Sequence, residues 1–442
     1  MPIFFHGLSS NWFSYLLGFF SGIIFIWFIN VAKEVYYKAG ELIREKRRKS
    51  QEDYLLTAES TYRNITYHYA QSLHLFSHLF PLDKICIVPT MLIPPSQVQP
   101  GESPFFTDLV STTIPYLPDW PEMAMRFGAK TVTLAQVIEQ ENILRVAIHG
   151  NAGSGKTTAL AHFASILCKG EPCNKKLEEY LPILVHIGEI NLDSVADPVE
   201  NLITAALSRM SSSLETRGIK ILLNAKIRQG KAILLLDGLD ELPVQDIDKS
   251  VKYLQSLSIH LPTLKVITTA SLEYFDGLRE LGFLFLPIAC WNRTQRSHYI
   301  KRWVEIWEEI SDNHETNPTN QLTNICLLLE PWINHNNPYA DPLTLTLVLW
   351  STLNNSLLGA KKIDAIESYT RCLCAPKVRP LVEKLAKQQL LSQCPIFTIE
   401  DLNRISPTLL ESLSELIKSG LVKQYHTQKI CFIHPIFASH LA

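Results

Sequence analysis

The sequence of 442 residues has little net charge, no paired cysteine pattern and no visible repeat of about 20–50 residues. Its 41 lysines and arginines nearly balance 43 acidic residues, and the net charge of −2 gives no bulk attraction to nucleic acid. The nine cysteines lack the spacing of a zinc site or disulfide framework, which indicates reduced thiols in a cytosolic setting. The apolar content of 46% is enough for large cores, and the length allows about two to four domains.

Charge is missing altogether from the first 32 residues, because Lys33 is the first charged side chain. Residues 12–32 form an apolar run whose length, as a helix, covers the ~30 Å hydrocarbon core of a bilayer. Lysine and arginine gather only after this run, so the positive-inside rule places residues 1–11 outside and the rest in the cytosol. We therefore expect a single-pass protein of the cell membrane, held by one N-terminal transmembrane helix. A cleaved signal peptide is the alternative, but the charged n-region is missing.

Periodicity and composition predict how the rest of the chain is organised. Residues 33–80 contain a basic cluster followed by apolar residues at steps of three and four, which predict an amphipathic helix ending near Pro81. Residues 81–130 hold nine prolines and predict an extended, non-helical connector. In residues 131–290, short apolar strands alternate with helical stretches. This alternation predicts an α/β domain with a doubly wound parallel sheet between helices.

Glycine is concentrated directly after the first of these strands. Residues 150–158 read GNAGSGKTT and fit the pattern G-x-x-x-x-G-K-[ST] in strand–loop–helix context. The glycines let backbone N–H groups approach a phosphate chain, at a helix N-terminus that favours anions. Lys156 would reach the β- and γ-phosphates of ATP, and the Thr157 hydroxyl would bind Mg²⁺. The candidate nucleotide-binding residues are Gly150, Asn151, Ala152, Gly153, Ser154, Gly155, Lys156, Thr157 and Thr158.

A second motif, ILLLDGLDE at residues 233–241, places acids after an apolar run. Asp237 is expected at the carboxyl end of a strand that neighbours the strand of the phosphate loop, where it would bind Mg²⁺ together with Thr157. The alternative is that Asp237, Asp240 and Glu241 form a solvated turn ahead of Pro243.

The spacing D-G-L-D-E resembles that of the NACHT family, in the STAND class of P-loop ATPases. The resemblance assigns Asp237 to magnesium and Asp240 or Glu241 to positioning the attacking water, with Gly238 leaving room beside the ion. The members that this sequence resembles are of the bacterial type, and the resemblance covers roughly residues 145–442.

Later fragments resemble further parts of the family. They imply a helical subdomain over 291–360, with Pro342 lining the adenine. They also imply a winged-helix domain over 361–442, with His434 touching the β-phosphate of ADP. The expected fold is therefore a P-loop NTPase domain followed by these two parts.

Two features depart from the family. Ser271 stands near the position where many members carry an arginine that senses the γ-phosphate, which predicts slow hydrolysis. The sequence ends eight residues after His434, before the repeats that detect a trigger in other members. The sensor is then missing, supplied by a partner or located in residues 50–130.

The leading hypothesis is a membrane-anchored, ATP-hydrolysing switch in signalling or defence. It would rest with ADP and form homo-oligomers when ATP replaces ADP, with Mg²⁺ as cofactor and an unknown protein as trigger or effector. The alternatives are an AAA+-like ATPase that remodels proteins at the membrane, and a nucleotide-binding module with degenerate hydrolysis. No nucleic acid partner is expected.

Overall fold

The structure is a computed structural model in which the chain forms two compact units, Met1–Ser60 and Thr61–Ala442. The residues that it describes are 16–21, 33, 45–46, 53–93, 130–140, 143–170, 176–192, 197–210, 213–242, 244–270, 275–310, 329, 341–354, 356, 361–392, 396–418, 420–425 and 429–442.

The predicted transmembrane helix over 12–32 lies mostly outside the described residues, which include only 16–21 of that span. Those six residues are helical and, at 1.5 Å per residue, cover about 9 Å. Nowhere in the described part of the chain does a helix have the length and apolarity needed to cross a membrane. This finding corrects the predicted single-pass location in the cell membrane, which would need about 30 Å of apolar helix.

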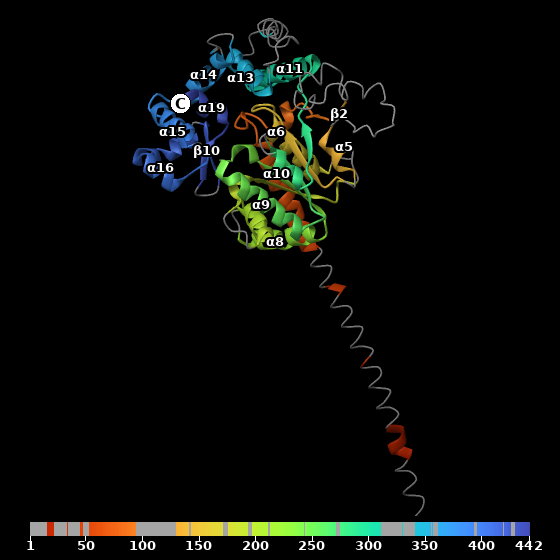
Figure 1. Cartoon of the computed structure of the whole chain (residues 1–442). Coiled ribbons are helices and arrows are strands. Elements are labelled where there is room, and N and C mark those ends of the chain that lie inside the picture. The colour runs from red at the N-terminus through yellow and green to blue at the C-terminus, as the bar shows by residue number, and fades with distance from the viewer. Residues whose placement is uncertain are drawn as a thin grey trace, which may run out of the picture. The chain divides into compact units, whose positions relative to one another are not determined.

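A parallel sheet of five strands forms the centre of the second unit (Figure 1). Its strands are β3 (Arg145–His149), β4 (Leu181–His186), β5 (Ala232–Asp237), β6 (Lys265–Ala270) and β7 (Leu284–Pro287). Their order is β4-β5-β6-β3-β7, and every neighbouring pair is parallel. The predicted parallel sheet is confirmed. The predicted neighbour of one strand was wrong. Asp237 ends β5, and β6 lies between β5 and β3, the strand that leads into the phosphate loop.

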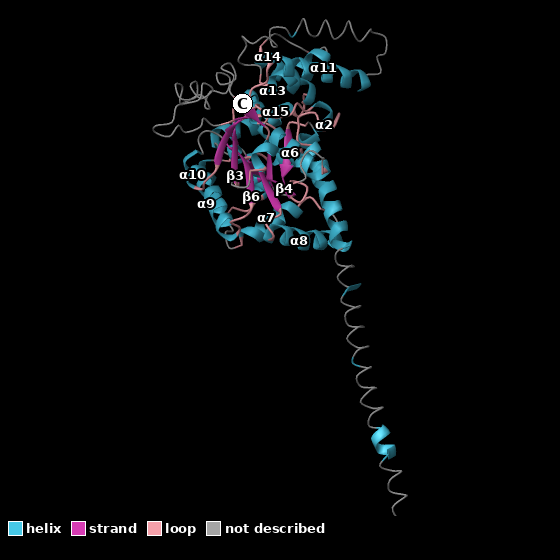
Figure 2. Ribbon diagram, turned by 90° about the vertical axis from the view of Figure 1, so that its right-hand side faces the viewer, coloured by secondary structure: helices cyan, strands magenta, loops and turns pink. Residues whose placement is uncertain are grey.

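Helices enclose this sheet (Figure 2), and β4, β5 and β6 are buried along their whole length. On β5, Ile233 and Leu235 share a core with Leu160 of the helix after the phosphate loop, whereas Leu234 and Leu236 are equally buried. Because successive strand residues point to opposite faces, both faces of the sheet are covered. The helices between and after these strands are α6 (Lys156–Lys169), α7 (Pro198–Leu207), α8 (Ser213–Arg228), α9 (Val244–His260) and α10 (Phe275–Glu280).

The segment before the sheet differs from its prediction. The helix expected to reach Pro81 ends at Gln71, and residues 72–80 form turns. Phe76 and Phe80 pack edge-to-face on Trp303, so contacts with a distant helix decide their place rather than helical periodicity. The described end of the expected connector contains one helical turn, α2 (Leu82–Ile85), whose two end residues are buried.

Two further short elements come from this region. β1 (Met91–Leu92) pairs antiparallel with β2 (Thr131–Val132), and α5 (Leu134–Ile138) follows. Residues 94–129, the rest of the expected connector, lie outside the described residues.

The C-terminal part combines helices with a small sheet. Its strands β8 (Ile396–Thr398), β9 (Val422–Tyr425) and β10 (Lys429–Phe432) are antiparallel in the order β8-β10-β9. Its helices are α11 (Arg293–Ile310), α13 (Pro342–Leu353), α14 (Lys362–Leu373), α15 (Arg379–Ser392), α16 (Ile399–Ile405), α17 (Pro407–Glu411), α18 (Leu413–Lys418) and α19 (Pro435–Leu441). One hydrophobic core joins these helices to Phe76 and Phe80.

Candidate nucleotide site

The phosphate loop, residues 150–155, connects β3 to α6. Gly153 and Gly155 adopt φ angles of +88° and +100°, in the left-handed region that side chains disfavour. A Cβ atom at Gly153 would lie 3.0 Å from Leu343 Cβ, and the Leu343 N–H donates to the Gly153 carbonyl at 3.2 Å. The glycines therefore shape the loop and also let α13 approach it closely.

Lys156 folds back over this loop and links it to the acidic motif. Its side chain is 8% exposed, and Nζ donates to the carbonyl oxygens of Gly150 at 2.6 Å and Asn151 at 3.3 Å. Nζ also lies 3.0 Å from Asp240 Oδ2. The structure thus brings together the two motifs that the sequence singled out, through an ion pair between a buried lysine and a partly exposed aspartate.

Asp237 is buried at the carboxyl end of β5. Its Oδ1 accepts hydrogen bonds from Thr157 Oγ1 at 3.2 Å and from Thr269 Oγ1 at 2.9 Å. Burial raises the pKa of this carboxyl. A cation would relieve that cost, because burial penalises an unpaired charge.

Thr269 is a functional candidate that the sequence analysis missed. Its hydroxyl accepts the Gly238 N–H at 2.9 Å while donating to Asp237, so it bonds to two consecutive residues where β5 ends and the turn begins. It reaches them because β6 is the neighbour of β5. The only signal in the sequence was a polar residue near the end of an apolar strand. Ser271 lies outside the described residues.

Asp240 and Glu241 belong to one short 3₁₀ helix, Leu239–Glu241, but they face different partners. Asp240 meets Lys156, whereas Glu241 Oε2 lies 3.2 Å from Nε2 of His186, the last residue of β4. His186 Nδ1 accepts the Gly188 N–H at 3.1 Å, so Nε2 carries the proton and donates to Glu241. Burial would raise the pKa of Glu241, but the nearby Lys423 charge and His186 lower it to about 2.

Gly238 sits against this imidazole. Its φ angle is +83°, and an added Cβ would lie 2.1 Å from His186 Nε2. The resemblance assigned this glycine to space beside the ion; in the structure, the atoms nearest to an added Cβ are those of the His186 ring.

We expect Gly238→Ala to lower the free energy of unfolding by about 1–2 kcal/mol for the left-handed backbone and by about 1–3 kcal/mol more for overpacking. Gly170→Ala is a matched control, because Gly170 has a φ of +62° and nothing within 4 Å of its added Cβ. Urea unfolding of both variants measures the difference. Equal losses would contradict the close contact with His186.

His434 and Pro342 reach the same place from the C-terminal part. His434 precedes α19, and its Nδ1 accepts the Ile436 N–H at 3.2 Å, which leaves Nε2–H as a free donor position on the ring. Burial lowers the pKa of His434 to about 4, so the ring is neutral at pH 7. Pro342 is the first residue of α13, at the helix end that contacts the phosphate loop.

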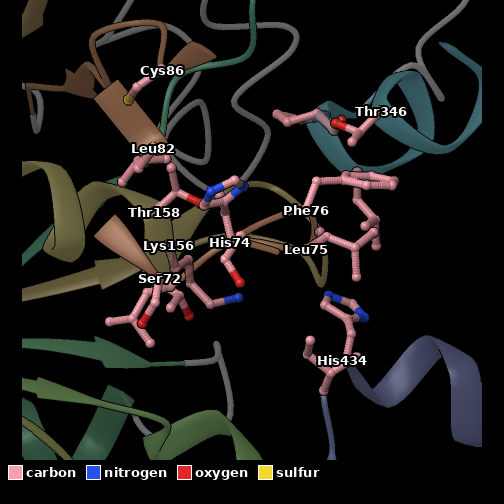
Figure 3. A pocket seen from close by; sticks show the side chains of 18 of the residues that line it. Ser72, His74, Leu75, Phe76, Leu82, Cys86, Lys156, Thr158, Thr346 and His434 are labelled. Atoms are coloured by element: carbon pink, nitrogen blue, oxygen red, sulfur yellow. The ribbon is translucent and has the colours of Figure 1, made fainter. Parts of the chain in front are cut away.

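One cavity of about 740 Å³, a volume within the usual range for ligand sites, is lined by Lys156, Thr157, Asp240, Glu241, Pro342 and His434. Asp237, Thr269 and His186 lie behind this lining rather than in it. In Figure 3, Lys156 and His434 project toward the cavity from different elements. Trp291, Tyr299 and Trp303 add an aromatic wall. Residues 72–77, 85–87, 89 and 90 also line the cavity, although the sequence analysis gave them no part in the site.

The residues present fit a nucleotide with Mg²⁺. Ser154 Oγ is buried in the phosphate loop without a hydrogen-bond partner. Within the described ranges, no group of three or more acidic, histidine or cysteine side chains could hold a metal by itself. Thr157 and Asp237 form a pair suited to Mg²⁺, which commonly takes one or two protein ligands and completes its shell with phosphate oxygens and water.

Comparison with known families agrees with this geometry. Residues 144–304 match the family model described as NACHT domain. This part of the chain is a NACHT domain. It is a P-loop NTPase domain related to the STAND and AAA+ ATPases, and the match covers less than half of the 442 residues. No curated protein matches the sequence.

Several solved structures are similar at low identity. The Aeropyrum pernix ORC1 protein in complex with DNA is 15% identical, with 70% of this chain and 89% of that chain covered and a TM-score of 0.33. Drosophila ORC bound to DNA is 13% identical, with 79% and 95% covered and a TM-score of 0.28. The S. cerevisiae Hsp104–ADP complex is 14% identical, with 64% and 36% covered and a TM-score of 0.33. At these TM-scores the likeness carries no argument about the ligands of this chain.

Proposed function

We propose that this protein is an ATP-hydrolysing switch that rests with ADP and associates into homo-oligomers when ATP replaces ADP. One observation carries the proposal: a single cavity is lined by the phosphate loop of the NACHT domain and by His434 from the C-terminal part. A nucleotide bound there would contact both parts at once. Whether the nucleotide carries two or three phosphates could therefore decide whether the NACHT domain and the C-terminal part stay together.

In this proposal the phosphate loop and Lys156 bind the phosphates, and Thr157 with Asp237 holds Mg²⁺, which would screen phosphate charge when bound. Pro342 lies beside the adenine, and the aromatic wall of Trp291 offers further apolar surface for the base. The small C-terminal sheet with its helices takes the role of the winged helix. A role in signalling or defence, with an unidentified protein trigger, completes the proposal.

The proposed reaction is hydrolysis of the terminal phosphate. A water oxygen forms a bond to the γ-phosphorus, and the bond from the γ-phosphorus to the bridging oxygen breaks. That oxygen keeps the electron pair and leaves with ADP. A carboxylate of Glu241 or Asp240 orients the water and accepts its proton, after which the proton passes to solvent or phosphate.

His434 is the proposed reader of ADP. Its Nδ1 is occupied by the backbone of α19, so the ring can offer only Nε2–H, the atom needed to donate to a phosphate oxygen. A hydrogen bond to a charged acceptor contributes about 1.5–3 kcal/mol. Because the ring is neutral at pH 7, this donation does not depend on protonation near physiological pH.

We expect His434→Ala to raise the dissociation constant of ADP about tenfold or more, while that of ATP changes less than about threefold. ATP is expected in an opened form in which the contact is already lost. Titration calorimetry with both nucleotides measures the effect, and chromatography of the nucleotide that co-purifies should show loss of ADP.

His434→Asn is the matched variant, because asparagine also caps a helix but does not place a donor where Nε2 lies. It should lose ADP preference like His434→Ala while keeping more of the stability of α19. An unchanged ratio of ADP to ATP dissociation constants in both variants would refute the switch, and rapid continuous turnover by the wild type would favour a remodelling ATPase instead.

A further inference from the structure

The strand β9 presents two residues of one face to the NACHT domain. Lys423 and Tyr425 are two positions apart, so they point the same way, and the Lys423 ammonium lies 4.7 Å from the Tyr425 ring centroid. Val422 points to the other face and is buried in the C-terminal core. The neighbouring strand adds an anchor, because Lys429 Nζ donates to the Gly188 carbonyl at 2.8 Å. The small sheet thus docks on the turn that follows β4.

At this docking point the Tyr425 ring stacks on His186. The ring centroids are 4.1 Å apart and the planes differ by 10°. The same imidazole uses its ring edge, through Nε2, to hydrogen-bond to Glu241 Oε2 at 3.2 Å. His186 is 2% exposed and Tyr425 is 7% exposed, so the stack is closed to water. A residue of the C-terminal sheet is therefore one side chain away from the carboxylate that we propose orients the attacking water.

We propose that His186 is a positioning residue that holds Glu241 in an unproductive orientation, and that Tyr425 ties this hold to the docking of the C-terminal sheet. This inference rests on the proposed ATPase function. While the sheet is docked, the stack fixes the imidazole plane and directs Nε2–H at Glu241. When the sheet leaves, the stacking partner and the charge of Lys423 leave with it, and the carboxylate is released.

The physical reason is competition for one carboxylate. To orient a water and accept its proton, Glu241 must present an oxygen toward the γ-phosphate. In this structure Oε2 already accepts from His186, and the nearby Lys423 ammonium stabilises the ionised form. A carboxylate that is stabilised in this way is a weaker base. The docked form should hydrolyse ATP slowly even when nucleotide is bound.

The test measures ATP turnover in variants of the full chain. Tyr425→Ala should raise kcat about fivefold, on the scale of one hydrogen bond, while the dissociation constant of ATP stays within about twofold. Tyr425→Phe keeps the stacked ring and should retain the wild-type rate. Adding Glu241→Gln to Tyr425→Ala should abolish the gain, because the gain acts through Glu241. A merely structural role of Tyr425 would lower kcat instead.

Lys423→Met is a second, independent variant that keeps the side-chain length and removes the charge. It should also raise kcat, and it decides the matter if Tyr425→Ala does not fold. A folded variant of either kind with wild-type or lower kcat would overturn the inference, as would a gain that survives Glu241→Gln. If the wild type binds ADP but neither it nor the variants hydrolyse ATP, the inference fails and nucleotide binding stands. If nothing binds ADP, the proposed function fails first, and the inference with it.

Discussion

Replacing Lys156 with alanine is expected to raise the dissociation constants of both ATP and ADP at least tenfold, which corresponds to about 1.4 kcal/mol. Lys156 is the only lysine or arginine within residues 150–158. Its ammonium already lies against two loop carbonyls and its side chain is 8% exposed, so the charge is oriented before a ligand arrives. Preorganised charge contributes more to phosphate binding than a mobile charge, because less conformational entropy is lost.

Titration calorimetry with each nucleotide checks this prediction. Lys252→Ala is the control, because Lys252 is an exposed lysine of α9 that does not line the cavity. Thermal unfolding should accompany the titrations, since Lys156→Ala also leaves Asp240 without its ion-pair partner. Unchanged affinities in a folded Lys156→Ala protein would show that the phosphates bind elsewhere.

Replacing both acids after Gly238, as Asp240→Asn with Glu241→Gln, is expected to lower kcat for ATP hydrolysis about 100-fold, or about 2.7 kcal/mol. ATP should still bind, because the phosphate loop and Asp237 are kept. The largest expected effect is on turnover, because the amides keep the shape of the acids but cannot accept a proton from water; Asp240→Asn adds a smaller change in affinity by releasing Lys156.

The single variants separate the two acids. Asp240 pairs with Lys156, whereas Glu241 contacts His186, so we expect Glu241→Gln to account for most of the loss of turnover. Asp240→Asn should mainly alter nucleotide affinity, because it releases the lysine. Phosphate release under saturating ATP measures kcat. A double variant that hydrolyses ATP at the wild-type rate would show that neither acid positions the water.

A P-loop domain with a parallel sheet could be predicted from local patterns, and the spacing D-G-L-D-E added the resemblance to the NACHT family. The apolar strands over 145–149 and 232–237, and the glycines before Lys156, are short-range signals, since strand burial and loop backbone shape depend on neighbours in the sequence. The sheet itself followed from the alternation of strands and helices. The order of the strands did not, because pairing is decided by how the whole layer packs. This is why β6 was not expected between β3 and β5, and why Thr269 was missed.

The apolar run over 12–32 shows the limit of such reasoning at the other end of the chain. Hydropathy predicted a membrane location, and the described residues contain no helix that could cross a membrane. Phe76 gives a second example: its spacing fitted a helix, but it lies in a turn against Trp303. Tertiary packing overrides periodicity where a side chain finds a large aromatic core.

By itself, then, the sequence determined the phosphate loop, the acid that ends β5 and the class of the sheet that carries them. Those features need only a strand, a turn and a helix in succession, and the physics of each is local. Only the tertiary structure decided that Asp240 meets Lys156 and that Glu241 meets His186, two acids adjacent in the chain with different partners. It also decided that Tyr425 stacks on His186. These contacts join residues far apart in the sequence, and they depend on how the C-terminal sheet docks, which no pattern within either segment encodes.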